Sequence, residues 1–240
     1  MAVQLVLEVV VVAQSHSMRF SIIIPTLNEE HVLSENALFF KKIKDKLNAE
    51  IIVVDGGSHD ATTQVAKTFS SKVVRSSPSR SKQQNIGTIY ANGDFLIFMH
   101  ADTIISDEAI KCIQMLTNDF IWGFFKVNLD SNKMKYKALS YLINLRSKIF
   151  NYSTGDQVLI IQKDFFIKNK GFKNICLMED IEFTNRIKRI EKPILINEYA
   201  LTSARRWEAK GFIKTVILMR LLRILYYFGA SDKLLLKLYK

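Results

Sequence analysis

Short apolar segments alternate with longer segments of helical periodicity over the first hundred residues, and this alternation constrains the fold more than any other feature. The apolar segments cover 20–26, 50–58, 72–76 and 93–102, and helices are expected over 29–47, up to residue 69, and over 80–92. Strands that are apolar along their whole length are typical of parallel sheets buried beneath helices. The sequence therefore predicts an α/β fold with a mostly parallel central sheet and helices on both faces.

Polar side chains follow each predicted strand. They occupy residues 26–29, residues 55–58, Arg80 and residues 100–102. In open parallel sheets, ligands bind outside the carboxyl ends of the strands. We therefore expect these side chains to meet at one edge of the sheet and to form the binding site there.

The second half of the chain has a less regular pattern. We expect strands over 120–129 and 157–162, an extended segment over 192–204, and helices over 134–152, from about 179, over 207–227 and over 233–239. The sequence has no linker, internal repeat or low-complexity stretch. We therefore expect residues 18–240 to form a single domain.

Composition excludes several classes of protein. Of the 240 residues, 48% are hydrophobic and 24% are charged, which excludes disordered and low-complexity chains. The 34 Lys and Arg residues exceed the 23 Asp and Glu residues, and the net charge of +11 favours nucleic acid, an anionic lipid surface or a phosphorylated small molecule as partner. Two cysteines are too few for a disulfide scaffold, so we expect an intracellular protein with reduced thiols. No Cys/His group has the spacing of a zinc site.

Residues 1–17 contain an apolar run that lacks Lys and Arg and is interrupted by Glu8. A secretory signal needs a positively charged start and a membrane-spanning helix needs about 20 apolar residues, so this segment fits neither. We expect an extension outside the folded core, with Met18 as an alternative start. An additional strand and a membrane-surface anchor are the alternatives. No later segment has 18 uncharged apolar residues in a row, so we do not expect an integral membrane protein.

The common phosphate-binding and nucleophile motifs are missing from the sequence. It has no GxGxxG after the first strand, no GxxxxGK[ST] and no GxSxG. These absences disfavour a dinucleotide-binding domain, a P-loop nucleotidase and a serine hydrolase. The chemistry must therefore come from carboxylates at the strand ends together with basic residues.

Four motifs in a fixed order resemble the family 2 glycosyltransferases of the GT-A fold. They are IIIPTLNEE (22–30), IVVDGGSHDAT (52–62), HAD (100–102) and MEDIEF (178–183), and the resemblance extends over 19–210. GDQ (155–157) and TSARRWE (202–208) also resemble a small, soluble bacterial group within that family. The resemblance implies transfer of a sugar from a nucleotide-diphospho-sugar, by default a UDP-sugar, to an acceptor hydroxyl with inversion. It implies a nucleotide-binding half over 19–102, an acceptor half over 103–210 and basic apolar helices over 207–240.

The resemblance assigns the nucleotide pocket to residues after the first three strands. Pro25, Thr26 and Glu29 would line it, and Asp55 would accept hydrogen bonds from the uracil or the ribose. The alternative for Asp55 is a cap on the following helix.

A basic segment follows the third strand. By resemblance, Arg80, Gln83 and Asn85 would contact the nucleotide or its phosphates. For Gln83, a position on a solvated helix face is the alternative.

His100, Ala101 and Asp102 stand where the family usually has the metal-binding DxD motif. The resemblance implies that Asp102 binds Mg²⁺ or Mn²⁺ against the diphosphate, because hard cations prefer oxygen ligands. The first carboxylate of the motif is absent, and His100 either ligates the metal or packs at the strand end.

Asp180 matches the family's catalytic base, which takes a proton from the acceptor hydroxyl. Its neighbour Glu179 cannot share a helix face with it, so we expect one of the two to point to the site and the other elsewhere. The alternative is that both are ordinary acidic residues in a first helical turn.

Arg205, Arg206 and Trp207 resemble the end of a QxxRW motif, with Ser203 in place of Gln. The two arginines would stabilise the departing diphosphate, and Trp207 would either stack on a substrate or pack beneath the helix. By the same resemblance, Gly155, Asp156 and Gln157 would shape the acceptor side.

The carboxyl-terminal end is basic and apolar. Nine basic and two acidic residues give 201–240 a net charge of +7, and residues 212–228 mix bulky apolar with basic side chains. This pattern is typical of a membrane-surface helix, which would suit a lipid-linked acceptor, but also of a core helix or a dimer contact. We expect a cytoplasmic protein, with peripheral contact at the inner membrane face. Nucleic acid is disfavoured because the charge lies at one end without interleaved aromatic residues.

Two other functions compete with glycosyl transfer. A nucleotidyltransferase would need a glycine-rich basic first loop, whereas PTLNEE is acidic. A non-catalytic basic protein that binds a membrane or partner through a degenerate site is the main alternative.

Overall fold

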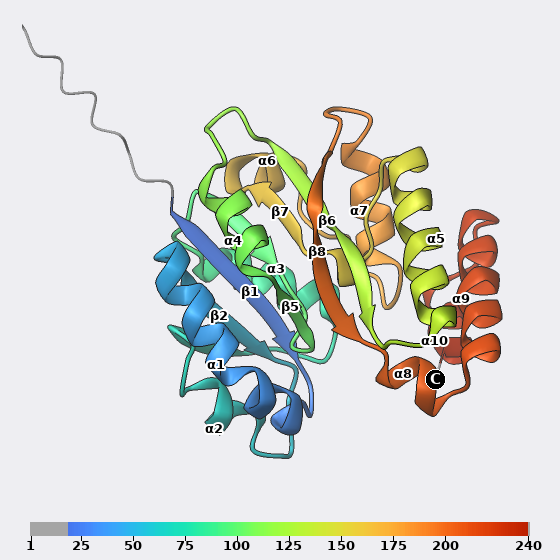
Figure 1. Cartoon of the computed structure of the whole chain (residues 1–240), viewed down its shortest axis with the longest axis horizontal. Coiled ribbons are helices and arrows are strands. Elements are labelled where there is room, and N and C mark those ends of the chain that lie inside the picture. The colour runs from blue at the N-terminus through green and yellow to red at the C-terminus, as the bar shows by residue number, and fades with distance from the viewer. Residues whose placement is uncertain (1–18, 240) are drawn as a thin grey trace, which may run out of the picture.

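The computed structural model describes residues 19–239, without the side chain of Arg206 (Figure 1). The expected extension over 1–17 therefore lies outside the described residues. The strands are β1 Phe20–Thr26, β2 Glu50–Asp55, β3 Lys72–Arg75, β4 Phe95–Phe98, β5 Thr103–Ile105, β6 Trp122–Asp130, β7 Leu159–Gln162 and β8 Ile194–Ser203. The helices are α1 Glu30–Leu47, α2 Thr62–Ala66, α3 Arg80–Tyr90, α4 Asp107–Gln114, α5 Met134–Phe150, the 3₁₀ helix η1 Gly155–Gln157, α6 Lys163–Lys168, α7 Glu179–Ile187, α8 Arg205–Ala209, α9 Phe212–Tyr227 and α10 Asp232–Tyr239.

The strands form one sheet in the order β3-β2-β1-β4-β7-β6-β8-β5. In the first half, β1 pairs in parallel with β2 and β4, and β2 pairs in parallel with β3. The register sets Thr26 opposite Asp55, so the carboxyl ends of β1 and β2 lie level with each other. The predicted α/β fold with its mostly parallel sheet is confirmed.

Antiparallel pairs extend this sheet in the second half. Strand β7 runs antiparallel to both β4 and β6, and β5 runs antiparallel to β8, whereas β6 and β8 are parallel. The pairing of β6 with β8 shifts between Phe125 and Lys126. Beyond this shift, residues 126–130 of β6 pair with residues 199–203 of β8.

Helices cover both faces of the sheet, as the sequence predicts. On one face, Ile22 and Ile24 of β1 belong to a core that includes Phe40 of α1 and Ile110 of α4. On the other face, Ile23 belongs to a core formed with α3, α6 and α7. Alternate residues of a strand point to opposite faces, so a strand between two cores has to be apolar throughout.

Local capping signals define several helix ends. Helix α1 ends at Asn48 in the left-handed conformation, with φ of 46°, and the Asn48 N–H donates to the Lys44 and Asp45 carbonyls. Helix α4 begins after Ser106, whose side chain accepts a hydrogen bond from the Ala109 N–H at 3.1 Å.

The structure corrects the expected helix over 207–227. It consists of two helices, α8 and α9, interrupted at Gly211, which has φ of 85°. This conformation is open to glycine and costly for other residues, so the chain turns here. The expected helix up to residue 69 ends earlier, at Ala66.

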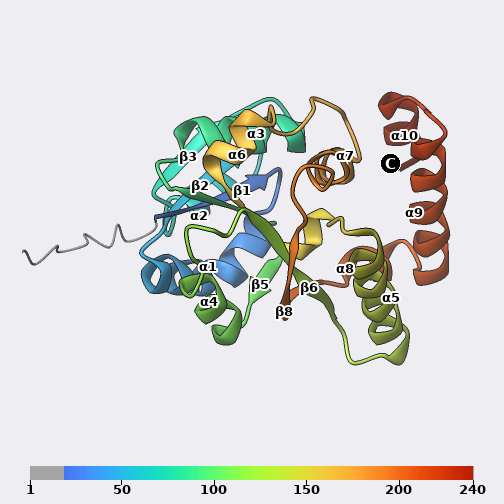
Figure 2. The same cartoon turned by 90° about the horizontal axis from the view of Figure 1, so that it is seen from above.

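The carboxyl-terminal helices pack beside the start of α7. Leu222 of α9 and Leu235 of α10 form a small core with Met178 and Ile181. Figure 2 shows α9 and α10 at one end of the molecule, opposite β3. Among the helices of residues 19–239, none is both long enough and apolar enough to cross a membrane.

Candidate active site

Three predicted residues from distant parts of the chain meet around Arg205. The Arg205 Nη2 atom lies 3.8 Å from Glu29 Oε2 and 3.7 Å from Asp102 Oδ2. Glu29 precedes α1, Asp102 precedes β5 and Arg205 begins α8. We call these three residues the Arg205 cluster. Burial and the charge of Asp102 raise the pKa of Glu29, although Arg205 opposes the shift.

Asp180 is fixed by backbone N–H groups. Its Oδ2 atom accepts a hydrogen bond from the Gly155 N–H at 2.6 Å, and its Oδ1 atom accepts one from the Ile181 N–H at 2.7 Å. Met178, two residues earlier, has φ of 69°, in the left-handed region. For a residue with a side chain this conformation is strained, and such strain clusters at functional positions.

The HAD and GDQ segments lie against each other. His100 Nδ1 lies 3.4 Å from Asp156 Oδ1, and His100 Nε2 is buried without a hydrogen-bond partner among residues 19–239. A Cβ atom on Gly155 would lie 2.6 Å from His100 Nε2, so this position requires glycine. We call Asp180, Gly155, Asp156 and His100 the Asp180 cluster.

Carboxylates of both clusters act electrostatically on Arg80. Burial of its guanidinium group lowers the pKa of Arg80, but Glu179, Asp156, Asp180 and Asp102 outweigh this and raise the pKa above its usual value. As a whole residue, Arg80 is exposed. Together with Arg205, it places two arginines among the carboxylates of this sheet edge.

Glu179 is only 4% exposed, in contrast to its half-buried neighbour Asp180. Burial and the charge of Asp180 raise the pKa of Glu179, while Arg80 opposes the shift. The expectation that one of the two side chains points to the site and the other elsewhere stays a prediction, because the charges of both act on Arg80. Whether either acts in catalysis stays a prediction.

Asp55 is fully buried and holds a turn. It accepts hydrogen bonds from the N–H groups of Gly57 and Ser58, both at 3.0 Å, and from the Ser58 hydroxyl. The alternative of a helix cap is wrong, because α2 begins only at Thr62 and is capped by Ala61. A nucleotide contact with this carboxylate stays a prediction.

The amide side chains after β3 bond within the protein. Gln83 donates to the Thr26 and Val54 carbonyls, both at 2.8 Å, and is 5% exposed, so the solvated alternative is wrong. Asn85 donates to the Phe172 carbonyl at 2.7 Å and accepts from the Phe172 N–H at 3.0 Å. Both amides therefore hold the site's framework together.

The remaining nucleotide-side residues line the sheet edge. Pro25 is half-buried, and the hydroxyl of buried Thr26 has no hydrogen-bond partner among the described residues. Ala101 is 4% exposed, and its carbonyl accepts from the Asn36 side chain at 2.9 Å. The Thr26 hydroxyl is thus a buried polar atom at the strand end, where a ligand is expected.

Trp207 packs beneath its helix. It contacts a small core formed by Leu129, Tyr136 and Ala204, and its ring centre lies 6.4 Å from that of Phe212. The structure therefore favours packing over stacking on a substrate. The side chain of Arg206 lies outside the described part of the chain.

Gln157 links η1 to its surroundings. Its Oε1 atom accepts from the Thr154 N–H at 3.1 Å and from the Ser147 hydroxyl at 2.9 Å, and its Nε2 atom donates to the Phe125 carbonyl at 3.2 Å. Thr154 and Gln157 form a capping box, a role that the sequence analysis did not assign. The T-x-x-Q spacing was the available signal.

A divalent metal fits Asp102 better than His100. Residues 19–239 contain no group of three His, Cys, Asp or Glu side chains that would hold an ion by themselves. Mg²⁺ is commonly held by one or two carboxylates together with substrate phosphates, which suits Asp102. His100 is unsuited as a ligand, because its Nε2 atom faces Gly155 and its Nδ1 atom faces Asp156.

The site therefore consists of carboxylates and arginines near the carboxyl ends of strands in an α/β sheet. The family model described as glycosyl transferase family 2 matches residues 21–173. The chain therefore belongs to glycosyl transferase family 2.

Curated relatives and solved structures agree with this assignment. The minor teichoic acid biosynthesis protein GgaA of Bacillus subtilis is 26% identical over 205 residues, which cover 78% of this chain and 44% of GgaA. An uncharacterized glycosyltransferase of Haemophilus influenzae is 24% identical over 201 residues, covering 77% of this chain and 78% of that protein. The chain thus spans less than half the length of GgaA.

Two solved structures show the GT-A fold. Staphylococcus aureus TarS 1–349 has a TM-score of 0.57 and 21% identity, covering 78% of this chain and 61% of that chain. The mannosyltransferase PcManGT of Pyrobaculum calidifontis, in complex with GDP-Man and Mn²⁺, has a TM-score of 0.59 and 18% identity, covering 78% and 57%. The expected GT-A fold is confirmed.

Proposed function

We propose that this protein transfers a sugar from a nucleotide-diphospho-sugar to an acceptor hydroxyl, with inversion at the anomeric carbon. The observation that carries the proposal is the fixed Asp180 carboxylate beside the Arg80 guanidinium, at the edge where parallel strands bind ligands. Residues 19–102 would bind the donor, and residues 103–210 would form the acceptor side of a single domain.

A UDP-sugar is the proposed donor. Crystal structures of TarS 1–349 in complex with UDP-GlcNAc and with UDP have TM-scores of 0.57 and 0.55 against this chain. Pro25, Thr26 and Glu29 line the proposed nucleotide pocket, and the unpartnered Thr26 hydroxyl is available to a nucleotide.

Asp180 acts as the base in the proposed reaction. Its carboxylate takes the proton of the acceptor hydroxyl while the hydroxyl oxygen forms a bond to the anomeric carbon. The bond from that carbon to the diphosphate breaks, and the diphosphate leaves with the electron pair. Attack from the side opposite the leaving group gives inversion.

The two arginines of the site balance the charge that builds on the diphosphate. Arg80 lies among the carboxylates of the site, and Arg205 lies between Glu29 and Asp102. A guanidinium group is suited to diphosphate because it is always charged and presents several donors in one plane. Both arginines would hold the leaving group more tightly as its charge grows.

Asp102 would hold a divalent metal, Mg²⁺ or Mn²⁺, together with the diphosphate. Such an ion supplies positive charge that neutralises the leaving diphosphate. The complex of PcManGT with GDP-Man and Mn²⁺ supports this part of the proposal.

A membrane surface is the proposed location of the acceptor, which would be lipid-linked. Ile213, Ile217, Leu221, Ile224 and Phe228 are exposed and recur at spacings of four, four, three and four residues. They therefore form one apolar stripe along α9. An anionic lipid surface suits this stripe, because exposed basic residues flank it. These flanking residues are Lys214 and Arg220. On this proposal the enzyme acts at the cytoplasmic face of a membrane.

The replacement Asp180→Asn tests the proposed reaction. We expect the rate of UDP release from a UDP-sugar to fall by roughly a hundredfold or more, because the base is lost. The dissociation constant for UDP should stay within a factor of about three, since the base does not hold the nucleotide. Release is measured with a coupled assay and binding by calorimetry.

Asp119→Asn, at an exposed position in the segment before β6, is the matched control and should leave both quantities unchanged. Equal losses of binding and rate in Asp180→Asn would contradict the role as base and indicate a structural one. Nucleotide binding without any turnover by the unmodified protein would favour the non-catalytic alternative.

A further inference from the structure

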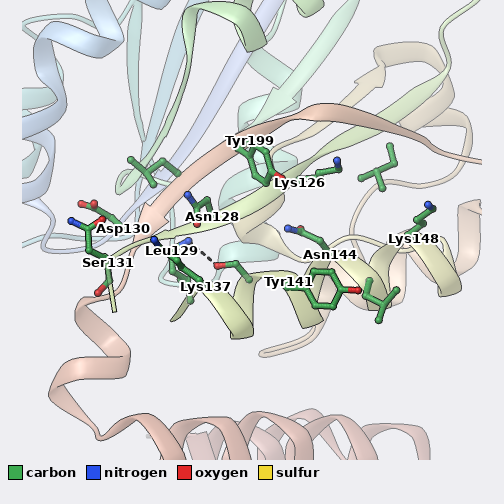
Figure 3. A pocket seen from close by; sticks show the side chains of 15 residues that line it. Lys126, Asn128, Leu129, Asp130, Ser131, Lys137, Tyr141, Asn144, Lys148 and Tyr199 are labelled. Carbon is green, nitrogen blue, oxygen red and sulfur yellow. Dashed lines mark hydrogen bonds between the residues drawn. The ribbon is translucent and has the colours of Figure 1, made fainter. Parts of the chain in front are cut away.

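A cavity of about 640 Å³ lies between α5 and the strands β6 and β8, outside the Asp180 and Arg205 clusters. Its wall includes Lys126, Lys137 and Lys148, and we call it the lysine cavity (Figure 3). We propose that the lysine cavity binds an anionic, hydroxyl-rich chain that forms part of the acceptor. This inference rests on the proposed function, because it assigns a substrate class to the acceptor side.

The charge of the lysine cavity favours anions. Three lysines line it against one carboxylate, that of Asp130. Lys126 is partly engaged, because its Nζ atom donates to the Asn197 side chain. Lys137 and Lys148 are exposed, and neither has a carboxylate within 4.0 Å among the residues that the structure describes. Two cations are therefore available to a ligand.

The spacing of these lysines favours a chain over a single small ion. Lys137, Tyr141, Asn144 and Lys148 follow each other at intervals of four, three and four residues, so they share one face of α5. Eleven residues of helix separate the two lysines by about 16 Å. Figure 3 shows Tyr141 and Asn144 between them. A ligand that contacts both lysines must carry repeated negative charges.

Aromatic and amide groups make the lysine cavity suitable for a hydroxyl-rich ligand. Tyr141 is 66% exposed and Tyr199 is 48% exposed, so both rings and their hydroxyls are accessible. Tyrosine combines an apolar ring face with a hydrogen-bonding tip, which suits the faces and hydroxyls of sugars and polyols. Asn128 and Asn132 add further polar groups to the wall.

The wall between α5 and β6 is fixed by hydrogen bonds. Asn144 accepts from the Val127 N–H at 2.8 Å and donates to the Val127 carbonyl at 2.9 Å. Ser140 accepts from the Leu129 N–H at 3.0 Å. Side chains of α5 thus make the hydrogen bonds to the β6 backbone that a neighbouring strand would otherwise make. The wall of the lysine cavity is therefore rigid before a ligand binds, and binding costs little conformational entropy.

The lysine cavity adjoins the Arg205 cluster. Asp130 and Leu201 line both the lysine cavity and a smaller cavity of about 110 Å³ whose wall includes Asp102 and Arg205. A chain bound along α5 can therefore extend past Asp130 toward the donor side. This continuity makes an acceptor a better occupant than an unrelated ligand.

Binding of defined oligomers to the full chain tests this proposal. The probes are a glycerol-phosphate oligomer, an oligogalacturonate with carboxylates in place of phosphates, and a neutral dextran oligomer of similar length. The test variant is Lys137→Gln with Lys148→Gln, and the matched control is Lys41→Gln with Lys67→Gln, two exposed lysines on α1 and after α2. Calorimetry measures each probe and, separately, UDP.

We expect at least one anionic oligomer to bind the unmodified protein and to lose roughly tenfold or more in affinity in the test variant only. The stronger of the two anionic probes identifies phosphate or carboxylate as the recognised group. Equal binding by the test and control variants, tight binding of dextran, or no binding of either anionic oligomer would overturn the proposal. The affinity for UDP should be the same in all variants. If UDP does not bind the unmodified protein, that result contradicts the proposed function and not the assignment of the lysine cavity.

Discussion

Glu179 and Asp180 are adjacent in the sequence but have different surroundings. Asp180 is half-buried and accepts N–H donors from Gly155 and Ile181, whereas Glu179 is 4% exposed and lies near Arg80. Burial favours the protonated form of a carboxyl group and raises the pKa of Glu179. This contrast suits the proposal that Asp180 is the proton acceptor.

The raised pKa of Glu179 predicts a pH-dependent effect on stability. The pKa of Glu179 is higher in the folded protein than in the unfolded chain. Such a carboxyl group stabilises the fold at pH values below its unfolded pKa. This contribution is lost as the pH rises through the folded pKa. The charged form therefore destabilises the protein at neutral pH. Glu179→Gln should raise the melting temperature at pH 7.5, with a smaller gain near pH 4.

Melting curves recorded across this pH range by circular dichroism provide the measurement. Glu191→Gln, at an exposed position before β8, is the matched control and should show no such trend. A lower melting temperature for Glu179→Gln at pH 7.5 would show that its ionised form is needed for folding, contrary to this prediction.

The sequence could predict which polar residues converge, because strand ends meet at one edge of a parallel sheet. It could not predict that His100 packs against Gly155, since that contact depends on where η1 lies relative to β4. Nor could it predict that Gln83 is buried, because the periodicity of α3 does not identify which strand carbonyls need a donor.

At the scale of elements, η1 connects α5 and α7 to the sheet. Gly155 holds Asp180, Asp156 lies beside His100, and Gln157 bonds to α5 and β6. Val158, which follows, has φ of 48°, a costly conformation for a β-branched residue. The surrounding hydrogen bonds must stabilise this strained segment.

Removing the Gln157 side chain should destabilise the whole protein. Gln157→Ala leaves the Thr154 N–H, the Ser147 hydroxyl and the Phe125 carbonyl without their buried partner. We expect the free energy of unfolding to fall by about 2–4 kcal/mol, from unsatisfied polar groups and an empty cavity.

Urea denaturation measures this loss. Gln114→Ala is the control, because the exposed Gln114 side chain makes a hydrogen bond to the Lys46 carbonyl and should cost about 1 kcal/mol or less. A similar small loss for both variants would contradict the connecting role of Gln157.

Most elements were predictable, including the short elements β3, β4, β7 and α10, but β5 was not. The expected strands and helices correspond to β1, α1, β2, α3, β6, α5, α7 and β8 within a few residues. Strand β5 has three residues and pairs antiparallel with the distant β8, so no local pattern marks it. The break between α8 and α9 depends on Gly211, whose isolated occurrence is only a weak signal in a sequence.

At the scale of the molecule, α9, the helix that carries the apolar stripe, lies at the end of the protein opposite β3 (Figure 2). The inner face of α9 packs through Leu222 against α7 and α10, so the outer face remains exposed. The expected alternative, that this carboxyl-terminal helix is a core helix, therefore holds only for the face of α9 that carries Leu222. A dimer contact and a membrane surface remain as partners of the outer face.

Replacing two residues of the stripe tests the membrane proposal. Ile217→Asp with Leu221→Asp should weaken binding to vesicles of phosphatidylglycerol and phosphatidylcholine in equal parts by roughly tenfold or more, because two buried apolar side chains are lost. Vesicle co-sedimentation provides the measurement. Leu38→Asp with Ile89→Asp, at exposed positions on α1 and α3, is the control.

Vesicle binding that is unchanged in the α9 variant would contradict membrane contact through this helix. Sedimentation equilibrium on the same proteins examines the dimer alternative. Loss of a dimer in the α9 variant, without any vesicle binding by the unmodified protein, would assign the stripe to self-association.

The most direct test of the account is calorimetric titration of the full chain with UDP, with and without Mn²⁺. The account predicts that UDP binds more tightly when Mn²⁺ is present. In Asp102→Ala, the increase in UDP affinity on addition of Mn²⁺ should be smaller by roughly tenfold or more. Asp164→Ala, at an exposed position on α6, should behave as the unmodified protein. No binding of UDP or of any UDP-sugar, with or without Mn²⁺, would contradict the claim that this sheet edge is a nucleotide-sugar site.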